Sequence, residues 1–216
     1  MVTPVQPPRL FFTSDHHFGH ARIIQYCQRP FASADEMDAA LIRLWNDTVG
    51  ADDLVYHLGD FTLQGLPQFT AIVRQLNGYL KILPGSHDQR WLERFRANDP
   101  ELRTGSGQTV ELLPPLLSLE TPRAALGTVR RPQVIVLCHY ALRVWDRSHY
   151  GAWHLYGHSH GNLPSLGLSF DIGVDCHGFR PLSLEEVALK MQALQADLVA
   201  PGSAGSRSAV QGLAGT

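Results

Sequence analysis

The sequence is poor in cysteine, and its cysteines form no pattern. Cys27, Cys138 and Cys176 are an odd number in a chain of 216 residues, and no two of them have the CxxC spacing. A framework of disulfides is therefore disfavoured, and a reducing compartment fits this cysteine usage better.

The chain also lacks a long apolar run and a strong charge of either sign. No stretch approaches the length of a membrane span, and the opening MVTPVQPPRL has prolines where a signal peptide would need an apolar helix. We therefore expect a cytoplasmic protein. The formal net charge of -2 gives no general attraction to nucleic acid or to an anionic membrane, so we expect no stable complex with either.

No internal repeat or linker separates the sequence into two domains. A chain of 216 residues with 44% hydrophobic content can bury one full core. The last segment, APGSAGSRSAVQGLAGT, is small and polar. We therefore expect one domain over residues 1–199 and a flexible tail over residues 200–216.

Strand-like apolar segments alternate with amphipathic segments in the first half of the chain. Ser33 and Glu36 form a capping box at the start of one predicted helix. This alternation favours parallel strands joined by helical crossovers. The predicted strands are 10–14, 54–58 and 79–83, and the predicted helices are 34–48, about 66–76 and about 88–97.

In the second half, beyond Gln108, the predicted strands follow one another without helices. They are TVELL, LLSLE, QVIVLC, AWHLY and LSFDIGV. Such a succession favours antiparallel pairing, so we expect a mixed sheet or two packed layers. A second capping box, from Ser183 to Glu186, predicts a final helix.

The most informative feature is that five apolar stretches each run into Asp or His. LFFTS leads to Asp15-His16-His17, LVYHLG to Asp60, YLKILPGS to His87-Asp88, VIVLC to His139, and WHLYG to His158-Ser159-His160. In layered α/β folds, ligands bind beyond the carboxyl ends of the strands. We therefore predict a metal centre where these five strand ends meet.

The donor types indicate which metal this centre would hold. The chain has eleven histidines, and the motifs offer imidazole and carboxylate but no thiolate. Such donors suit Mn, Fe or Zn better than Ca or Mg. They are too many for one tetrahedral ion, so we predict a pair of divalent ions. Two such ions facing few carboxylates would leave a positive pocket for a phosphate oxyanion.

Taken in order, the blocks SDHHFGH, LGDF, GSHD, CHY and GHSH resemble the calcineurin-like metallophosphoesterases. The resemblance spans about Leu10 to Asp175. The segments SDHHFGHARIIQYCQRPF and VDCHGFRPLSLEEV are similar to a small bacterial and phage-type branch of predicted phosphoesterases. The resemblance implies an α/β fold of α+β character, in which a two-layer mixed β-sandwich is flanked by helices and a dinuclear site lies in the crevice.

The resemblance also implies a role for each motif residue. Two divalent ions, Mn before Fe, Zn or Ni, would activate a hydroxide that hydrolyses a phosphomonoester or phosphodiester. The substrate would be a phosphorylated small molecule or nucleotide, and His87 would assist the leaving group. The first ion would bind Asp15, His17 and His160, the second would bind His139, His158 and Ser86, and Asp60 would bridge both.

Two departures from the family pattern matter. Ser86 stands where the family has Asn, whose carbonyl oxygen reaches the metal, so we expect weaker binding of the second ion and a lower rate. A natural serine and an engineered replacement of Asn would give the same sequence here. Leu63 and Gln64 replace the Asp and Arg of the protein-phosphatase branch, which argues against a close protein-phosphatase relative. Asp88 is the candidate to orient His87 in place of the missing Asp.

Three residues after the first motif are candidates for substrate binding. His20, Arg22 and Arg29 could contact phosphate, although His20 could instead cap a turn and the arginines could be ordinary surface residues. His16 should point to the opposite face from the metal ligands, and His57 lies inside an apolar strand, so we interpret both as structural.

Two other functions compete with a phosphoesterase of small molecules. One is an inactive or weakened member of the family that serves as a binding scaffold, with the second ion lost through Ser86. The other is a nuclease or cyclic-nucleotide phosphodiesterase of the same superfamily. A sequence-specific nucleic-acid binder is disfavoured because the chain has no basic stripe and no reading motif.

Overall fold

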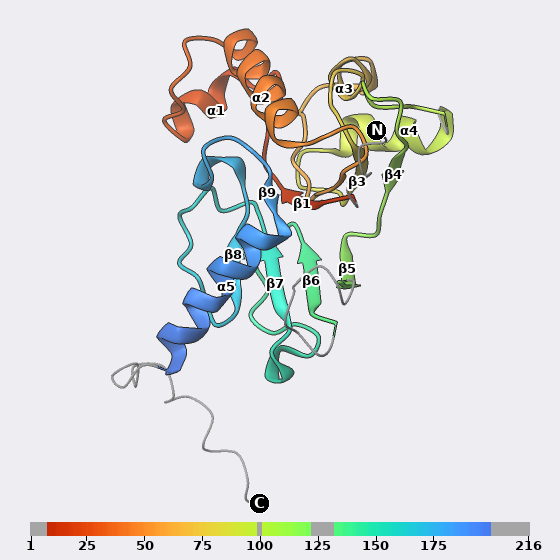
Figure 1. Cartoon of the computed structure of the whole chain (residues 1–216). Coiled ribbons are helices and arrows are strands. Elements are labelled where there is room, and N and C mark those ends of the chain that lie inside the picture. The colour runs from red at the N-terminus through yellow and green to blue at the C-terminus, as the bar shows by residue number, and fades with distance from the viewer. Residues whose placement is uncertain (1–7, 99–100, 122–131, 200–216) are drawn as a thin grey trace, which may run out of the picture.

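The computed structural model describes residues 8–98, 101–121 and 132–199. The tail predicted for residues 200–216 lies outside these ranges. The described chain is a mixed α/β structure with two mixed sheets, as Figure 1 shows. Five α-helices accompany the sheets: α1 (Ala21–Tyr26), α2 (Ala34–Thr48), α3 (Leu66–Val73), α4 (Gln89–Asn98) and α5 (Leu184–Val199). Within those ranges, none of the helices has the length and apolarity needed to cross a membrane.

The first sheet has five strands in the order β4-β3-β2-β1-β9. Strands β1 to β4 are parallel, and β9 is antiparallel to β1. The parallel core of this sheet confirms the pairing expected from the alternation of strands and helices in the first half. The strands are β1 (Leu10–Thr13), β2 (Leu54–His57), β3 (Tyr79–Ile82), β4 (Val110–Leu112) and β9 (Leu182–Ser183).

The second sheet has four strands, β5 (Leu116–Glu120), β6 (Val134–Cys138), β7 (Trp153–Tyr156) and β8 (Ser169–Asp171), paired in that order. The expected antiparallel pairing is right for β5 and β6 but wrong for β6, β7 and β8, which are parallel. Parallel strands need a connection of about a dozen residues, which is usually but not always an α-helix. The connections over residues 139–152 and 157–168 are long enough for this, although neither contains an α-helix.

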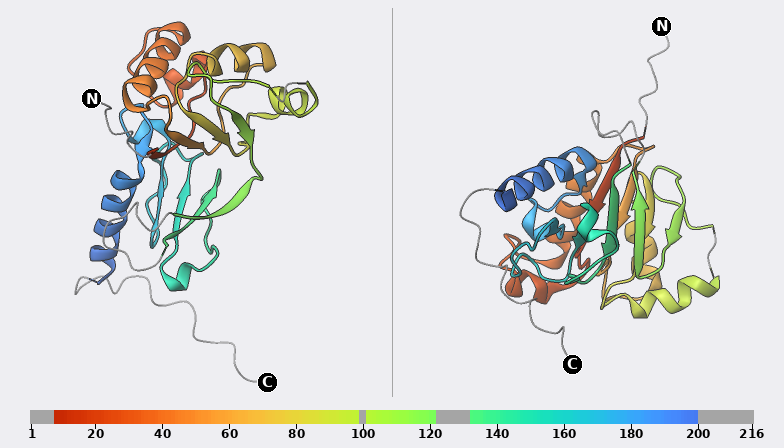
Figure 2. Two further views of the ribbon diagram at one scale, coloured as in Figure 1. Left: turned by 45° about the vertical axis from the view of Figure 1, so that its right-hand side comes forward. Right: turned by 90° about the horizontal axis from the view of Figure 1, so that it is seen from below.

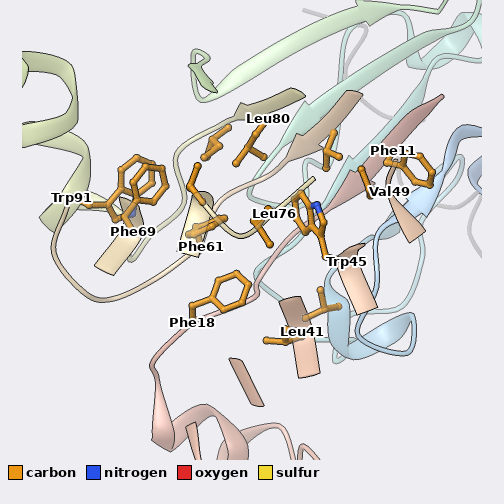
Figure 3. Close-up of a cluster of buried hydrophobic side chains, with 14 of the residues drawn as sticks. Phe11, Phe18, Leu41, Trp45, Val49, Phe61, Phe69, Leu76, Leu80 and Trp91 are labelled. Atoms are coloured by element: carbon orange, nitrogen blue, oxygen red, sulfur yellow. The ribbon is translucent and has the colours of Figure 1, made fainter. Parts of the chain in front are cut away.

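Two apolar cores hold these layers together. One lies on the helix-covered face of the first sheet, where the ring of Trp91 stacks on Phe69 with centroids 3.9 Å apart (Figure 3). The other joins the two sheets, because Phe12 from β1 packs in the same cluster as Leu155 from β7. Met191 brings α5 into this second core. Figure 2 shows the ribbons of the two sheets next to each other, with α5 alongside.

Both predicted capping serines cap their helices. The box from Ser183 to Glu186 is reciprocal, whereas the Glu36 carboxylate accepts from the N–H of Ala32 rather than of Ser33. The hydroxyl of Ser33 accepts from the backbone N–H of Glu36 at 3.1 Å, and the hydroxyl of Ser183 accepts from that of Glu186 at 3.2 Å. In return the Glu186 carboxylate accepts from the Ser183 N–H at 2.9 Å. Two complementary bonds satisfy N–H groups that a helix start otherwise leaves free, which fixes where α2 and α5 begin.

Candidate metal centre

The five predicted strand ends meet at one rim of the molecule. Asp15 follows β1, Asp60 follows β2 and His87 follows β3, and these three strands are parallel neighbours in the first sheet. His139 follows β6 and His158 follows β7, which are parallel neighbours in the second sheet. The candidate site is therefore built by loops that follow strands of both sheets.

Two groups of candidate ligands form there. Asp15, His17 and His160 make one group, and Asp60, His139 and His158 make the other; within each group the possible ligand atoms lie within 4.8 Å of one another. The groups adjoin through Asp60. Its Oδ2 atom is 3.6 Å from Nε2 of His17 and 3.5 Å from Nε2 of His139. One carboxylate thus lies between an imidazole of each group.

The donor atoms of these groups fit a cation. Four of them are buried and have no hydrogen-bond partner in the described part of the chain: Oδ1 of Asp15, both ring nitrogens of His17, and Nε2 of His139. A buried polar atom without a partner costs about 1–3 kcal/mol. A divalent ion would satisfy carboxylate oxygens and imidazole nitrogens at once, so the arrangement is suited to metal binding.

Two histidines are held in the tautomer that metal binding needs. Nδ1 of His139 is 2.8 Å from the carbonyl oxygen of Leu58, and Nδ1 of His160 is 2.7 Å from Oδ2 of Asp175. A carbonyl oxygen and a carboxylate only accept, so each Nδ1 carries a proton, and in the neutral ring Nε2 keeps its lone pair. Metal-binding histidines commonly donate their second nitrogen to such a partner.

The ligand loops have an unusual backbone. Of the eight residues other than glycine that have a positive φ in the described chain, five are candidate ligands. They are Asp15 (60°), His17 (54°), Asp60 (54°), His158 (66°) and His160 (47°). This left-handed region costs a residue with a side chain roughly 1–2 kcal/mol. Such a concentration of strain at one rim supports a functional role for these five side chains.

Burial and neighbouring charges shift the pKa values of the carboxyls in opposite directions. Burial raises the pKa of Asp15 to about 7, because water no longer stabilises its charged form. Burial opposes ionisation of Asp60 too, but the adjacent His139 and His17 imidazoles lower its pKa well below the usual value. Burial lowers the pKa of His17 to about 2, so this imidazole is neutral and its lone pair is available to a ligand.

Ser86 lies beside the second group but is engaged with Asp60. Its hydroxyl is 3.0 Å from Oδ2 and 3.2 Å from Oδ1 of that carboxylate, and Oδ1 also accepts from the backbone N–H of His87 at 2.8 Å. The serine proton is therefore directed at the carboxylate between the two groups. This contact agrees with a weak donor at that position, and the metal role of Ser86 stays a prediction.

The expected role of Asp88 needs correction. Its buried carboxylate accepts four N–H donors at 2.8–2.9 Å, from the backbones of Asp60, Phe61 and Gly85 and from the indole of Trp91. Among the described contacts, none joins it to the imidazole of His87. With its acceptor sites used in this way, Asp88 fixes the loops after β2 and β3, and it does not orient His87.

The candidate substrate residues separate into three cases. Arg29 is only 4% exposed, and its guanidinium is bound to Asp175 and to backbone carbonyls, so the prediction that it contacts substrate is wrong. Arg22 is exposed on α1. His20 comes just before α1, and its ring centroid lies 5.6 Å from that of His17, beside the first group. His87, the candidate to assist the leaving group, is half-exposed, with Nε2 3.9 Å from Oδ2 of Asp60.

His16 and His57 have the structural role expected of them. Both are fully buried, and Nδ1 of His16 lies 3.0 Å from Nε2 of His57. The backbone N–H of Gly59 donates to Nδ1 of His57, so His57 supplies the proton to His16. Through the hydrogen bond from Gly59, the pair supports the loop that carries Asp60.

Sequence reasoning missed two acidic residues that support the site. Asp175 binds His160 and Arg29, while the carboxylate of Asp171 accepts from the Ser159 hydroxyl at 2.5 Å and from the Gly161 N–H at 3.0 Å. Asp171 thereby holds the loop that carries His158 and His160. For Asp175 the available signal was its position directly after the predicted strand LSFDIGV, as in the other ligand loops, whereas Asp171 lies inside that predicted strand and gave no such signal.

No family model matches the chain. Over 90 residues it is 41% identical to an uncharacterized protein of Methanocaldococcus jannaschii, covering 41% of this chain and 51% of that protein. Over 83 residues it is 37% identical to the gene 66 protein of Mycobacterium phage D29, covering 37% of this chain and 40% of that protein. The chain thus spans about half or less of the length of the curated relatives it matches.

The comparison with solved structures supports the fold alone. A protein of unknown function from Aquifex aeolicus superimposes with a TM-score of 0.60 at 18% identity, covering 85% of this chain and 100% of that chain. A phosphopantetheinyl hydrolase from Mycobacterium tuberculosis reaches a TM-score of only 0.30 at 13% identity, covering 66% of this chain and 48% of that chain, which is too low to carry an argument. The chain therefore shares its fold with the Aquifex aeolicus protein, and neither that protein nor the sequence relatives supply an activity.

Proposed function

We propose that this protein is a metal-dependent phosphoesterase with two divalent ions, of the calcineurin-like metallophosphoesterase type. The observation that carries the proposal is the position of Asp60, whose Oδ2 lies within 3.6 Å of an imidazole nitrogen from each of two adjoining ligand groups. A carboxylate shared between two groups is what a pair of closely spaced ions requires. The order of the five sequence motifs supports the same reading.

Each ligand group would hold one ion. Asp15, His17 and His160 would hold the first, His139 and His158 would hold the second with or without Ser86, and Asp60 would contact both. Manganese suits this set best, with iron, zinc or nickel as alternatives. Divalent ions in such a site supply Lewis acidity and activate water for attack on phosphorus.

The residues at the mouth would act on the substrate directly. His87 is half-exposed and close to Asp60, so its imidazole can donate a proton to the departing alkoxide of a phosphoester bound over the ligand groups. His20 would donate to a non-bridging phosphate oxygen, because its ring lies against His17 beside the first group. Arg29 has no part in this step, because its guanidinium is buried and already paired. We propose a phosphorylated small molecule or nucleotide as the substrate.

The first test is hydrolysis of chromogenic phosphomonoesters and phosphodiesters after treatment with a chelator and addition of Mn²⁺, Zn²⁺ or Mg²⁺. We expect turnover that depends on the added metal and that is lost in His87→Ala, a variant that keeps every proposed metal ligand. Folded, metal-loaded protein that turns over none of these substrates, both as the present chain and as Ser86→Asn, would contradict the proposal.

A non-catalytic binding scaffold is the second candidate. The observation in its favour is that the Ser86 hydroxyl is hydrogen-bonded to Asp60. The second group therefore lacks the amide oxygen that the family's Asn would supply at this position. Turnover in Ser86→Asn but not in the present chain would assign the defect to the second ion. A nuclease or cyclic-nucleotide phosphodiesterase would cleave nucleic acid or a cyclic nucleotide in preference to the chromogenic monoester.

A further inference from the structure

Arg29 ties together two loops of the site that lie far apart in the sequence. Its Nε and Nη2 atoms each lie 2.8 Å from a carboxylate oxygen of Asp175. Its Nη1 and Nη2 atoms donate to the backbone carbonyls of His16 and Asp15, at 2.8 and 2.7 Å. The fixed fork of one buried guanidinium thus connects the loop after β1 with the segment that follows β8.

Asp175 passes this connection on to a candidate ligand. The Oδ2 atom that accepts from Arg29 also lies 2.7 Å from Nδ1 of His160. The resulting chain runs from the backbone of Asp15, through Arg29 and Asp175, to the imidazole of His160. It therefore holds His160 in register with the other two members of the first group.

Among the residues that the structure describes, no carboxylate accepts from Nδ1 of a histidine in the second group. His139 is oriented by the neutral carbonyl oxygen of Leu58 rather than by a carboxylate. The ring of the exposed His158 is held by packing, with centroids 4.8 Å from Tyr140 and 5.1 Å from His139. A carboxylate partner raises the basicity of a ligating imidazole and fixes its orientation. Because its acceptor is charged, this hydrogen bond is stronger than one to a neutral carbonyl oxygen.

We propose that Arg29 and Asp175 are positioning residues that make the group of Asp15, His17 and His160 the tighter of two metal sites, so that the two ions load in a fixed order. The inference rests on the proposed function for the presence of two ions. It concerns their relative affinity, which is independent of turnover. The second site, with Asp60, His139 and His158, fills last and exchanges more readily.

The test is a calorimetric titration of chelator-treated, full-length protein with Mn²⁺. We expect two binding events of unequal affinity. Asp175→Asn should weaken the tighter event by about 10- to 100-fold, because loss of the partner of a ligating histidine typically costs that much. The weaker event should be unchanged in Asp175→Asn, and His158→Gln should remove the weaker event alone.

Glu186→Gln is the matched control. It breaks another bidentate pair, in which Arg180 lies 2.6 Å from the Glu186 carboxylate, but this pair contacts no imidazole. Both binding events should survive that substitution. Two events of equal affinity, or an Asp175→Asn variant that weakens only the looser event, would overturn the inference.

A measurement on the unsubstituted protein keeps the inference testable if Asp175→Asn does not fold. Nitrogen-15 NMR of the metal-free protein, at a pH where the ring is neutral, should find His160 protonated on Nδ1. Protonation on Nε2 would overturn the inference. Turnover in a protein that binds two ions with equal affinity would refute the order of loading but not the phosphoesterase function. Two ions bound with unequal affinity in a protein without turnover would support the order of loading and contradict the phosphoesterase function.

Discussion

At the scale of single residues, Asp60 is the carboxylate that lies close to imidazoles of both candidate ligand groups. Its carboxylate lies near His17 and His139 and also accepts from Ser86 and the backbone of His87. Asp60→Asn replaces one shared oxygen by an amide nitrogen, which cannot bind a cation. We expect both ions to bind more weakly and kcat/KM to fall by more than about 100-fold, beyond the range typical of residues that only support a ligand.

Metal content by mass spectrometry and initial rates would check this prediction together. His158→Ala is the comparison, because that residue belongs to one group only. An Asp60→Asn variant that keeps two ions, or that loses no more activity than His158→Ala, would argue against a shared carboxylate.

Ser86 leads to a prediction in the opposite direction. Ser86→Asn supplies an amide oxygen that reaches further than the hydroxyl, and it releases Asp60 from the hydrogen bond that the serine donates. We expect tighter binding of the second ion and a higher rate at low Mn²⁺. Ser86→Ala, which offers no donor, should bind the second ion no better than the present chain does. Equal Mn²⁺ dependence of Ser86→Asn and Ser86→Ala would show that this position does not touch the metal.

The buried pair of His57 and His16 predicts how stability depends on pH. Burial lowers the pKa of His57 to about 3, against an ordinary value of 6.5. Between these values the ring is neutral when folded and protonated when unfolded, so the unfolded chain binds more protons. The free energy of unfolding must then fall as the pH drops from 6.5 toward 3, by up to about 1.4 kcal/mol per pH unit for this one ring.

The variant His57→Gln isolates this contribution, because its amide can still accept from Gly59 but does not titrate. Asp15, whose raised pKa acts in the opposite direction between 3.8 and about 7, is common to both proteins and cancels. Urea unfolding of chelator-treated protein between pH 4 and 6 should give a shallower pH dependence for the variant. Parallel curves would mean that His57 is charged in the fold.

At the scale of elements, the start of α2 depends on one hydroxyl. Ser33 accepts from the Glu36 N–H at 3.1 Å, and the Glu36 carboxylate accepts from the Ala32 N–H at 2.8 Å. Ser33→Ala removes the first of these bonds and should lower the free energy of unfolding by about 1 kcal/mol. For a chain of this size that corresponds to a Tm lower by about 2–4 °C. Ser33→Asp, which keeps a capping oxygen, should retain the Tm in a thermal scan, and equal losses in both variants would contradict this account.

The elements that the sequence predicted well are those with two independent signals. Helix α2 has a capping box and an apolar face, and its observed bounds, Ala34–Thr48, are the predicted ones. Helix α1 and strand β9 were not predicted, because six and two residues are too short to show a period. The parallel pairing of β6, β7 and β8 could not be read either, since it depends on how irregular loops cross between strands.

The candidate site divides in the same way. The proposed ligands could be located from sequence because each follows an apolar strand, and parallel strands bring their ends to one rim. The roles of Arg29 and Asp88 could not be predicted from sequence, because a motif does not say which partner a side chain will contact. Arg29 binds Asp175, which is 146 residues away, and Asp88 accepts donors from two different loops.

At the scale of the whole molecule, the site belongs to the packed pair of sheets and to neither sheet alone. Asp15 and Asp60 follow strands of the first sheet, while His139 and His158 follow strands of the second. Ions held between them should bind the folded state only. At a free Mn²⁺ concentration 100 times the Kd, one such ion stabilises the fold by about 2.7 kcal/mol.

We therefore expect Mn²⁺ to raise the Tm of chelator-treated protein by about 5–10 °C. Asp60→Asn should respond far less, since its affinity for the ions is lower. A thermal scan at several Mn²⁺ concentrations measures this shift. A Tm that does not depend on Mn²⁺ would mean that no ion bridges the sheets.

The left-handed backbone at Asp15, His17, Asp60, His158 and His160 has a consequence for protein engineering. Glycine would adopt each of these conformations without strain, so a selection for thermostability in the presence of a chelator would favour replacing the residues that the chemistry needs. Heat-resistant variants gathered without metal and without an activity screen should accumulate glycine or asparagine at this rim, whereas selection with Mn²⁺ present should retain the ligands.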